Sequence, residues 1–272
     1  MIDQPTICFG QQPCGFFPKR FLVAKINTAR VLQKKIGGRM VFFYHDSDAD
    51  YRETITIFRD RSTNAEARLN FTQENKLQKK HSPLYLKRVP TGWKEEVLKQ
   101  LPRFVGRSMI DLFSSIDKNT AADFCLEMYN KLGLLEGIEV VRSSNPDFRQ
   151  RAADITAGFV DIKYQGEIVR AKIISESDPV PSTLNPQPFA SLHEGGPVYT
   201  YLPKPDKITK QQITPGAESR FSWMNSVIGC THYIYGEGEK DYLKFEDFPE
   251  VKFIQRDEIN NSNFAFIPIH NS

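Results

Sequence analysis

The first forty-five residues constrain the fold most, because they read as a strand, a turn, a helix and a second strand. The apolar run 6–9 is followed by the segment 10–15, whose glycines and proline mark a turn. Apolar residues then recur every three or four positions across 21–36, which is typical of a helix with one buried face, and a Gly-Gly pair predicts its end. The continuous apolar run 40–44 indicates a strand buried on both faces. This order predicts a βαβ unit with a right-handed crossover.

Later segments repeat this alternation of apolar runs and helical stretches. Short apolar runs recur at 138–141 and 231–235. Helices are expected at 94–104, 119–132, 147–153 and 217–227. Strands that alternate with helices are typical of a parallel sheet. The sequence therefore predicts an α/β fold, Rossmann-like, with one mainly parallel sheet formed by 6–9, 40–44, 138–141 and 231–235.

One region departs from the pattern and predicts a small antiparallel insertion at 155–175. Two strictly alternating runs, 160–164 and 167–173, flank a Gln-Gly turn, which is typical of a β-hairpin with one face in water. The segment 177–212 is rich in proline and glycine and is expected to be one long functional or mobile loop. The whole chain, 1–272, is expected to form a single α/β domain. Further short strands or apolar segments are expected at 54–58, 67–71, 245–254 and 264–269.

Composition narrows the class of protein. A net charge of +3 over 272 residues is too small to argue for nucleic-acid binding. The four cysteines lack the spacing of a zinc site and are expected to be reduced thiols. No apolar run reaches the roughly 18 residues of a membrane span, and the N-terminus lacks the order of a signal peptide. We therefore expect a cytoplasmic protein with a small-molecule ligand and no nucleic-acid or membrane partner; a homo-oligomer stays open.

Polar residues follow two of the predicted strands where each strand ends. Gly10, Gln11 and Gln12 follow the first strand, and His45 begins a polar run after the second. Because ligands bind beyond the carboxyl ends of parallel strands, we expect these turns to open onto one crevice. Backbone N–H groups and a helix N-terminus there favour an anion. The alternative for Gln11 and Gln12 is a capped turn with both amides in solvent.

An acidic run after the second strand has two functional interpretations. Asp46, Asp48, Asp50 and Glu53 could hold a magnesium ion, which prefers oxygen ligands. Close carboxylates also raise one another's pKa, which would suit Asp48 or Asp50 as a general base. His45 is a further acid/base candidate. The plain alternative is a solvated turn beside a hydrogen-bonded structural histidine.

Basic side chains and a second pair of glycines are expected at the same crevice. Lys25 lies on the first predicted helix and Arg220 on a later one, and arginine binds carboxylate or phosphate through two hydrogen bonds. Gly236 and Gly238 follow the strand 231–235 and would let the backbone approach a ligand closely. The alternatives are surface ion pairs for the basic residues and a plain turn for the glycines.

Four stretches together resemble the cysteine-adding enzyme of bacillithiol synthesis, the bacillithiol synthase family. They keep the family's order along residues 6–243. The matching positions are Gly10-Gln11-Gln12 with Lys25, 41–43 with Asp48, Asp50, Tyr51 and Glu53, 133–149, and 233–239 with Tyr242. The resemblance implies a Rossmann-like core related to nucleotide-using ligases and nucleotidylyltransferases. The candidate cofactor it implies is a nucleotide with magnesium, and no residue is assigned to a separate metal site.

Two departures from the family change the expected activity. The family has a histidine between its two aspartates where this chain has Ala49, and the nearest histidine is His45. The family's long coiled-coil region also has no heptad counterpart here. We therefore expect another reaction on the same core in place of cysteine ligation.

Two functional hypotheses follow. The first is an enzyme of the ligase or nucleotidyl-transfer type that acts on a small polar metabolite. Gln11 and Gln12 would hold the substrate or a phosphate, and Asp48 or His45 would assist proton transfer. The second is a non-catalytic ligand-binding or regulatory protein on a degenerate enzyme core, which Ala49 favours.

Overall fold

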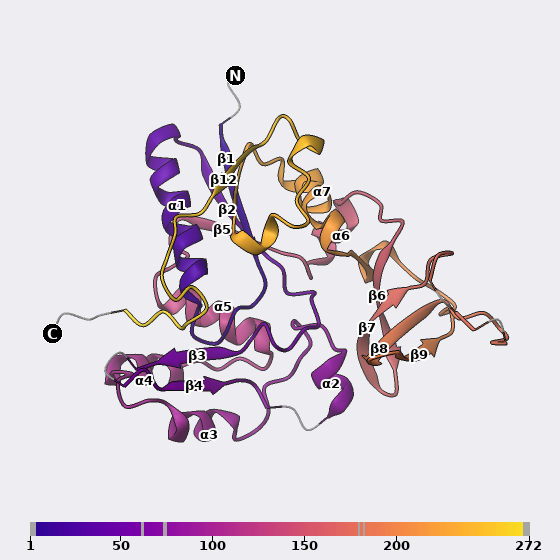
Figure 1. Ribbon diagram of the computed structural model, residues 1–272, viewed down its shortest axis with the longest axis horizontal. Coiled ribbons are helices and arrows are strands. Elements are labelled where there is room, and N and C mark those ends of the chain that lie inside the picture. The colour runs from indigo at the N-terminus through magenta and orange to yellow at the C-terminus, as the bar shows by residue number, and fades with distance from the viewer. Residues whose placement is uncertain (1–3, 61–62, 73–74, 179, 182, 269–272) are drawn as a thin grey trace.

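A five-stranded parallel sheet forms the centre of the protein (Figure 1). The computed structural model describes residues 4–60, 63–72, 75–178, 180–181 and 183–268. In spatial order the strands are β12 (Lys252–Gln255), β11 (His232–Tyr235), β1 (Thr6–Gln11), β2 (Arg39–Tyr44) and β5 (Ile138–Arg142). The predicted α/β class is confirmed, as is the placement of the four predicted strands in one parallel sheet.

Helices cover both faces of this sheet, because successive side chains on a strand point to opposite faces. Ile7 and Phe9 pack into a core with helices α1 (Arg20–Ile36) and α5 (Ala121–Lys131). Cys8 packs on the other face, with helices α6 (Pro146–Arg151) and α7 (Ala217–Ile228). In Figure 1, α1 and α7 accordingly lie on opposite sides of the strands. All four helices were expected from the sequence, with ends that differ by a few residues.

The connection from β2 to β5 forms a lower layer in Figure 1. The short strands expected at 54–58 and 67–71 are present as β3 (Thr56–Arg59) and β4 (Glu66–Leu69), which pair antiparallel. The expected helix at 94–104 is α3 (Trp93–Gln100), which ends before Pro102. Two further helices, α2 (Lys76–Lys80) and α4 (Arg107–Ser114), were not expected. Trp93 packs edge-on or tilted against Phe16, Phe113 and Phe124, so aromatic rings join this layer to α5.

A second sheet is antiparallel and lies to the right of the parallel sheet in Figure 1, in the order β10-β6-β7-β8-β9. The predicted hairpin is confirmed: β6 (Gly158–Tyr164) and β7 (Glu167–Ile173) are joined at Gln165 and Gly166, both with positive φ. Its outer face is only partly in water, because Asp161 and Arg170 are buried. These two residues bring polar groups to the boundary with the parallel sheet.

The prediction of one long loop at 177–212 is wrong in part, because some of this segment is folded into that antiparallel sheet. It contains β8 (Ala190–Gly195) and β9 (Val198–Leu202), followed by a short 3-10 turn and β10 (Ile213–Pro215). Ala190 and Leu192 are buried against β6 and β7. The apolar residues that are buried here belong to one short strand. The surrounding prolines and glycines made this strand hard to recognise in the sequence.

The C-terminal segment closes the sheet edge and then runs past α1. The apolar segment 245–254 becomes a short 3-10 turn, η3 (Phe245–Asp247), and strand β12. In place of the expected strand at 264–269, Ala265 forms one isolated bridge with Lys19, and Ile269 lies outside the described residues.

Candidate functional site

A cleft of about 460 Å³ opens at the carboxyl edge of the parallel sheet. It lies where the strand order reverses, because the chain continues from β1 to β2 on one side and later adds β11 on the other. The turns after β1 and β11 diverge at such a point, and ligands bind there in open α/β sheets. The volume suits a small molecule.

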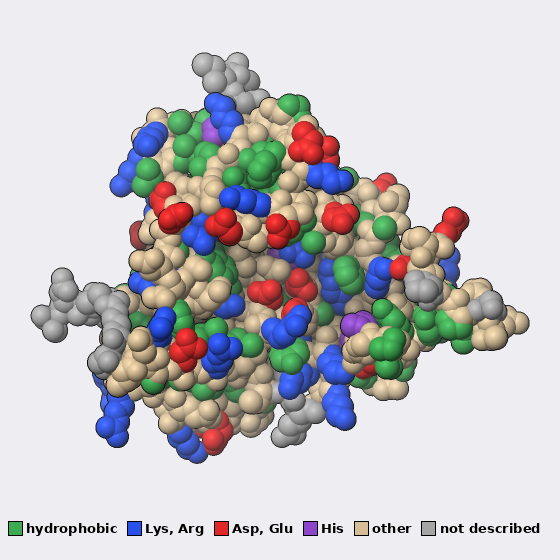
Figure 2. All heavy atoms as spheres, viewed as in Figure 1, with side chains coloured by type: hydrophobic (Ala, Val, Ile, Leu, Met, Phe, Trp, Pro, Cys, Tyr) green, Lys and Arg blue, Asp and Glu red, His purple; other side chains and the backbone are tan. Residues whose placement is uncertain are grey.

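Most of the residues predicted for the site meet in this cleft, although they come from distant parts of the chain. Those that line it are Gly10, Gln11, Gln12, Lys25, His45, Arg220, Gly236 and Gly238. Asp48 lies beside them, where its carboxylate accepts a hydrogen bond from Gln12 Nε2 at 3.3 Å. Asp50 is not brought to the cleft lining, and its carboxylate pairs with the exposed Arg52 at 2.6 Å. Figure 2 shows acidic and basic side chains interspersed across the middle of this face.

An ion pair fixes the turn after β1 against the turn after β11. The Lys25 ammonium is buried and donates to the Gly10 carbonyl at 2.7 Å and to the Glu239 carboxylate. Glu239 also accepts from the Gly236 N–H at 2.7 Å and from the Tyr233 hydroxyl at 2.8 Å. Lys25 therefore has a structural role, which is to join the turn after β1 to the turn after β11. Glu239 and Tyr233 were missed as site residues, although Glu239 lies three residues after Gly236, the spacing of a capping contact.

His45 is the most unusual polar group of the cleft. It is only 1% exposed, and neither ring nitrogen has a hydrogen-bond partner among the described residues. One face of the ring stacks on Phe43, with 5.9 Å between centroids. Burial, and then the positive charge of Arg220, lower the pKa of His45 well below its usual value. The imidazole is therefore neutral near pH 7, with one donor and one acceptor available at the cleft.

The acid/base assignment among the carboxylates differs from the one expected. Burial alone would raise the pKa of Asp48, but the charges of Arg170 and Arg220 outweigh it and lower that pKa. Asp48 is thus an ionised partner of Arg220, at 3.5 Å, and a weak base. The carboxylate with a raised pKa is Glu53, chiefly because it is buried and also because Asp48 lies near it. Glu53 lines the cleft and is the better candidate for proton transfer.

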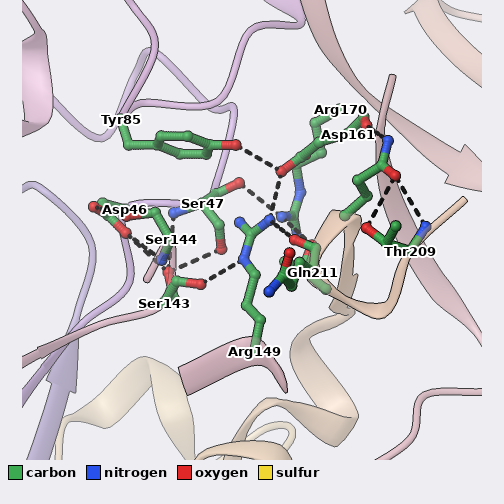
Figure 3. Close-up of polar contacts among 12 residues, drawn as sticks. Asp46, Ser47, Tyr85, Ser143, Ser144, Arg149, Asp161, Arg170, Thr209 and Gln211 are labelled. Atoms are coloured by element: carbon green, nitrogen blue, oxygen red, sulfur yellow. Dashed lines mark hydrogen bonds and ion pairs between the residues drawn. The ribbon is translucent and has the colours of Figure 1, made fainter. Parts of the chain in front are cut away.

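The predicted magnesium cluster is not assembled. Asp46 is fully buried and bonds to Arg142, Ser143 and Ser144, so it joins β2 to β5 (Figure 3). Asp50 points to Arg52. Within the ranges that the structure describes, no group of three or more His, Cys, Asp or Glu side chains is arranged to hold a metal ion.

Arg220 places a guanidinium at the cleft. Its Nε atom is buried and has no hydrogen-bond partner among the described residues, while its Nη2 atom faces Asp48. Arg256 lines the same cleft. Phe221 and Tyr242 form an aromatic wall, and burial raises the pKa of Tyr242, which keeps its phenol neutral. The cleft therefore offers unpaired donors for an anionic group, amides, and one carboxylate that can exchange a proton.

Comparison with known proteins gives no match, either to a protein-family model or to a curated protein. No helix in the described part of the chain is long and apolar enough to cross a membrane.

Proposed function

We propose that the protein is an enzyme of the ligase or nucleotidyl-transfer type that binds a small, polar, anionic metabolite in the cleft. The observation that carries this proposal is the convergence of Gln11, His45 and Gly236 at the reversal of strand order. Numbered along the chain, the parallel strands have the order 3-2-1-4-5, which is that of Rossmann-like nucleotide-binding sheets. The proposed ligand spans the turns after β1 and β11.

The resemblance to the bacillithiol synthase family supports the same site. Gln11, Gln12 and Glu53, which carry the resemblance, all line the cleft. Ala49 replaces the family's histidine. Its backbone carbonyl accepts a hydrogen bond from Lys87 Nζ at 2.9 Å. We therefore assign a different reaction from cysteine ligation.

In the proposed reaction each polar group has one task. Gln11 and Gln12 hold the polar part of the substrate, and the free Nε–H of Arg220 binds its anionic group. Glu53 exchanges the proton, and the neutral ring of His45 orients the reacting group. Asp48, which was first expected to be the base, instead orients Gln12 and Arg220.

A second candidate function is non-catalytic ligand binding on a degenerate enzyme core. The observation that favours it is the internal pairing of cleft charges, Lys25 with Glu239 and Arg220 with Asp48. Such ion pairs can fix the geometry of a binding pocket without taking part in a reaction. Ala49 favours the same interpretation, because the family's acid/base histidine is missing.

A ligand screen tests the proposal. A ligand that binds only the folded state raises the melting temperature by mass action. We would screen ATP, ADP, CTP, cysteine and sugar–malate conjugates, and then titrate any ligand found into wild type, Gln11→Ala and Gln150→Ala by calorimetry. Gln150 is an exposed glutamine of α6 and serves as the control. We expect Gln11→Ala alone to weaken binding by about tenfold or more, the cost of one hydrogen bond to a charged group.

Turnover separates the two candidate functions. Ligation assays with and without ATP should show little or no joining of cysteine to glucosaminyl-malate. Robust cysteine ligation would contradict our inference that Ala49, in place of the family's histidine, prevents this reaction. Binding that is unchanged in Gln11→Ala would move the site away from this cleft, and binding without turnover of any ligand would favour the non-catalytic function.

A further inference from the structure

Arg170 joins two segments of the chain that lie far from it in sequence (Figure 3). It belongs to strand β7 of the antiparallel sheet and is only 6% exposed. Its guanidinium donates to the Ser47 carbonyl at 2.7 Å, to the Thr214 hydroxyl, and to the Pro215 carbonyl at 3.1 Å. One side chain therefore holds both the turn after β2 and the segment that leads into α7.

Both of these segments carry a residue of the cleft. Ser47 directly precedes Asp48, and Pro215 lies just before α7, which carries Arg220. Asp48 and Arg220 face each other at 3.5 Å. Arg170 itself is outside the cleft lining, so it acts on the site through these two neighbours.

Arg170 is itself held firmly. Its backbone N–H donates to the His81 carbonyl at 2.8 Å, and its guanidinium lies over the Phe159 ring, 4.3 Å from the centroid. Burial lowers the pKa of Arg170 to about 10, so the side chain stays protonated at neutral pH.

The charge of Arg170 also reaches the titratable groups of the cleft. Burial and Arg220 are the main causes of the lowered pKa of His45, and Arg170 and Arg149 lower it further, while Asp48 opposes them. These groups come from α7, β7, α6 and the turn after β2. Arg170 also makes the largest charge contribution that lowers the pKa of Asp48 against the effect of burial.

We propose that Arg170 is the positioning residue of the cleft: from the antiparallel sheet it holds the Asp48 turn and the start of α7 so that Arg220 and His45 face the ligand. The proposal rests on the proposed function for its ligand, but the geometry it describes is independent of the ligand. An arginine is needed because its planar fork reaches several acceptors at once, whereas lysine is a point charge on a flexible stem.

Four variants test this role: Arg170→Lys keeps the charge, Arg170→Met removes it, and Thr214→Val removes one acceptor with little change in shape. Lys172→Met is the control, because the exposed Lys172 lies two residues along β7 and its side chain pairs only with Asp178 among the contacts described. The readouts are calorimetric affinity for ADP at pH 7 and NMR titration of the His45 ring. His45 is assigned among the five histidines from the spectrum of His45→Gln.

We expect Arg170→Lys to weaken ADP binding about tenfold, the effect of losing a fixed charged contact, with the His45 titration unchanged. Arg170→Met should weaken binding and also move the His45 midpoint to higher pH, while Lys172→Met changes neither. A merely structural role would not separate the two readouts in this way. Unchanged ADP affinity in both Arg170→Lys and Thr214→Val would overturn the proposal.

A wild type that binds no ADP would count against a nucleotide as the ligand of the proposed function, and not against the positioning role. The amide signal of Asp48 and the Nε–H signal of Arg220 then decide the positioning role without a ligand. Shifts of both signals in Arg170→Lys and Thr214→Val, but not in Lys172→Met, support it. Signals that stay in place in these variants overturn it. If Arg170→Met does not fold, Thr214→Val still tests the proposal, because it removes one contact of Arg170 with little change in shape.

Discussion

His45 combines deep burial with two ring nitrogens that have no partner in the described structure. A buried polar group without a hydrogen bond costs about 1–3 kcal/mol, and a protein keeps such a group where it serves a ligand. The neutral ring also links stability to pH. Because its pKa is lowered in the folded state, the unfolded chain takes up the proton first as the pH falls.

The first prediction follows from this linkage. Below about pH 6.5 the unfolded state binds a proton at His45 that the folded state does not, so the free energy of unfolding falls as the pH falls. His45→Gln should remove part of that slope, up to about 1.4 kcal/mol per pH unit, in urea denaturation between pH 5 and 7. His81 and His232, whose pKa values burial also lowers, contribute to the remaining slope. An identical slope in wild type and variant would contradict a neutral His45.

The second prediction concerns Glu53. Its raised pKa means that the folded state holds a proton that the unfolded state releases, so its contribution to stability is lost as the pH rises through the folded pKa. Glu53→Gln should therefore raise the free energy of unfolding slightly near pH 7, by about 0.5 kcal/mol, since the group is partly solvated. The same change should abolish turnover of any substrate found in the screen. Glu176→Gln, at an exposed position outside the cleft lining, is the control and should change neither property.

At the scale of elements, the ends of strands carried most of the predictable information. Gln11, His45 and Gly236 could be placed together because each follows a buried apolar run, and parallel strands bring their carboxyl ends to one edge. Arg170 could not be found this way. It lies on an alternating hairpin whose polar face was expected in water, and only the packing of the two sheets buries it. The pKa shifts could not be found this way either: arginines distant in sequence lower the pKa of Asp48, and burial in the folded chain raises the pKa of Glu53.

The third prediction concerns the contact between β1 and β11. Gly10 needs no left-handed backbone, but a Cβ atom there would lie 2.8 Å from the Tyr233 hydroxyl, which is held by Glu239. Gly10→Ala should therefore lower the free energy of unfolding by about 1–3 kcal/mol, the usual cost of overpacking. Tyr233→Phe in the Gly10→Ala background should restore part of the loss, because it removes the clashing oxygen. Equal melting temperatures of the single and double variants would show that the hydroxyl is not the obstacle.

At the scale of the whole molecule, a buried polar junction joins the two five-stranded sheets (Figure 3). Arg149 on α6 donates to Asp161 on β6 at 2.9 Å and to the Ser143 carbonyl at 2.8 Å. Tyr85 adds a hydrogen bond to the same Asp161 oxygen at 3.0 Å. Since Arg170 contacts the Ser47 carbonyl, next to Asp48, across this boundary, the junction couples the antiparallel sheet to the site.

The last prediction tests this junction. Arg149→Met leaves the Asp161 carboxylate buried without its cation, which should cost about 3–5 kcal/mol of unfolding free energy. Asp161→Asn in the same background removes the stranded charge, so the double variant should lose less than the sum of the two single changes, by about 1 kcal/mol or more. Arg88→Met breaks a pair with Glu167 in which Arg88 is exposed, and should cost less than about 1 kcal/mol. Additive losses at Arg149 and Asp161 would mean that the two sheets are held by apolar packing and not by this pair. Urea denaturation of the wild type, Arg149→Met, Asp161→Asn, the double variant and Arg88→Met at one pH separates these results. Because Arg149 also contributes to the lowered pKa of His45, the His45 titration of Arg149→Met shows whether loosening the junction reaches the cleft.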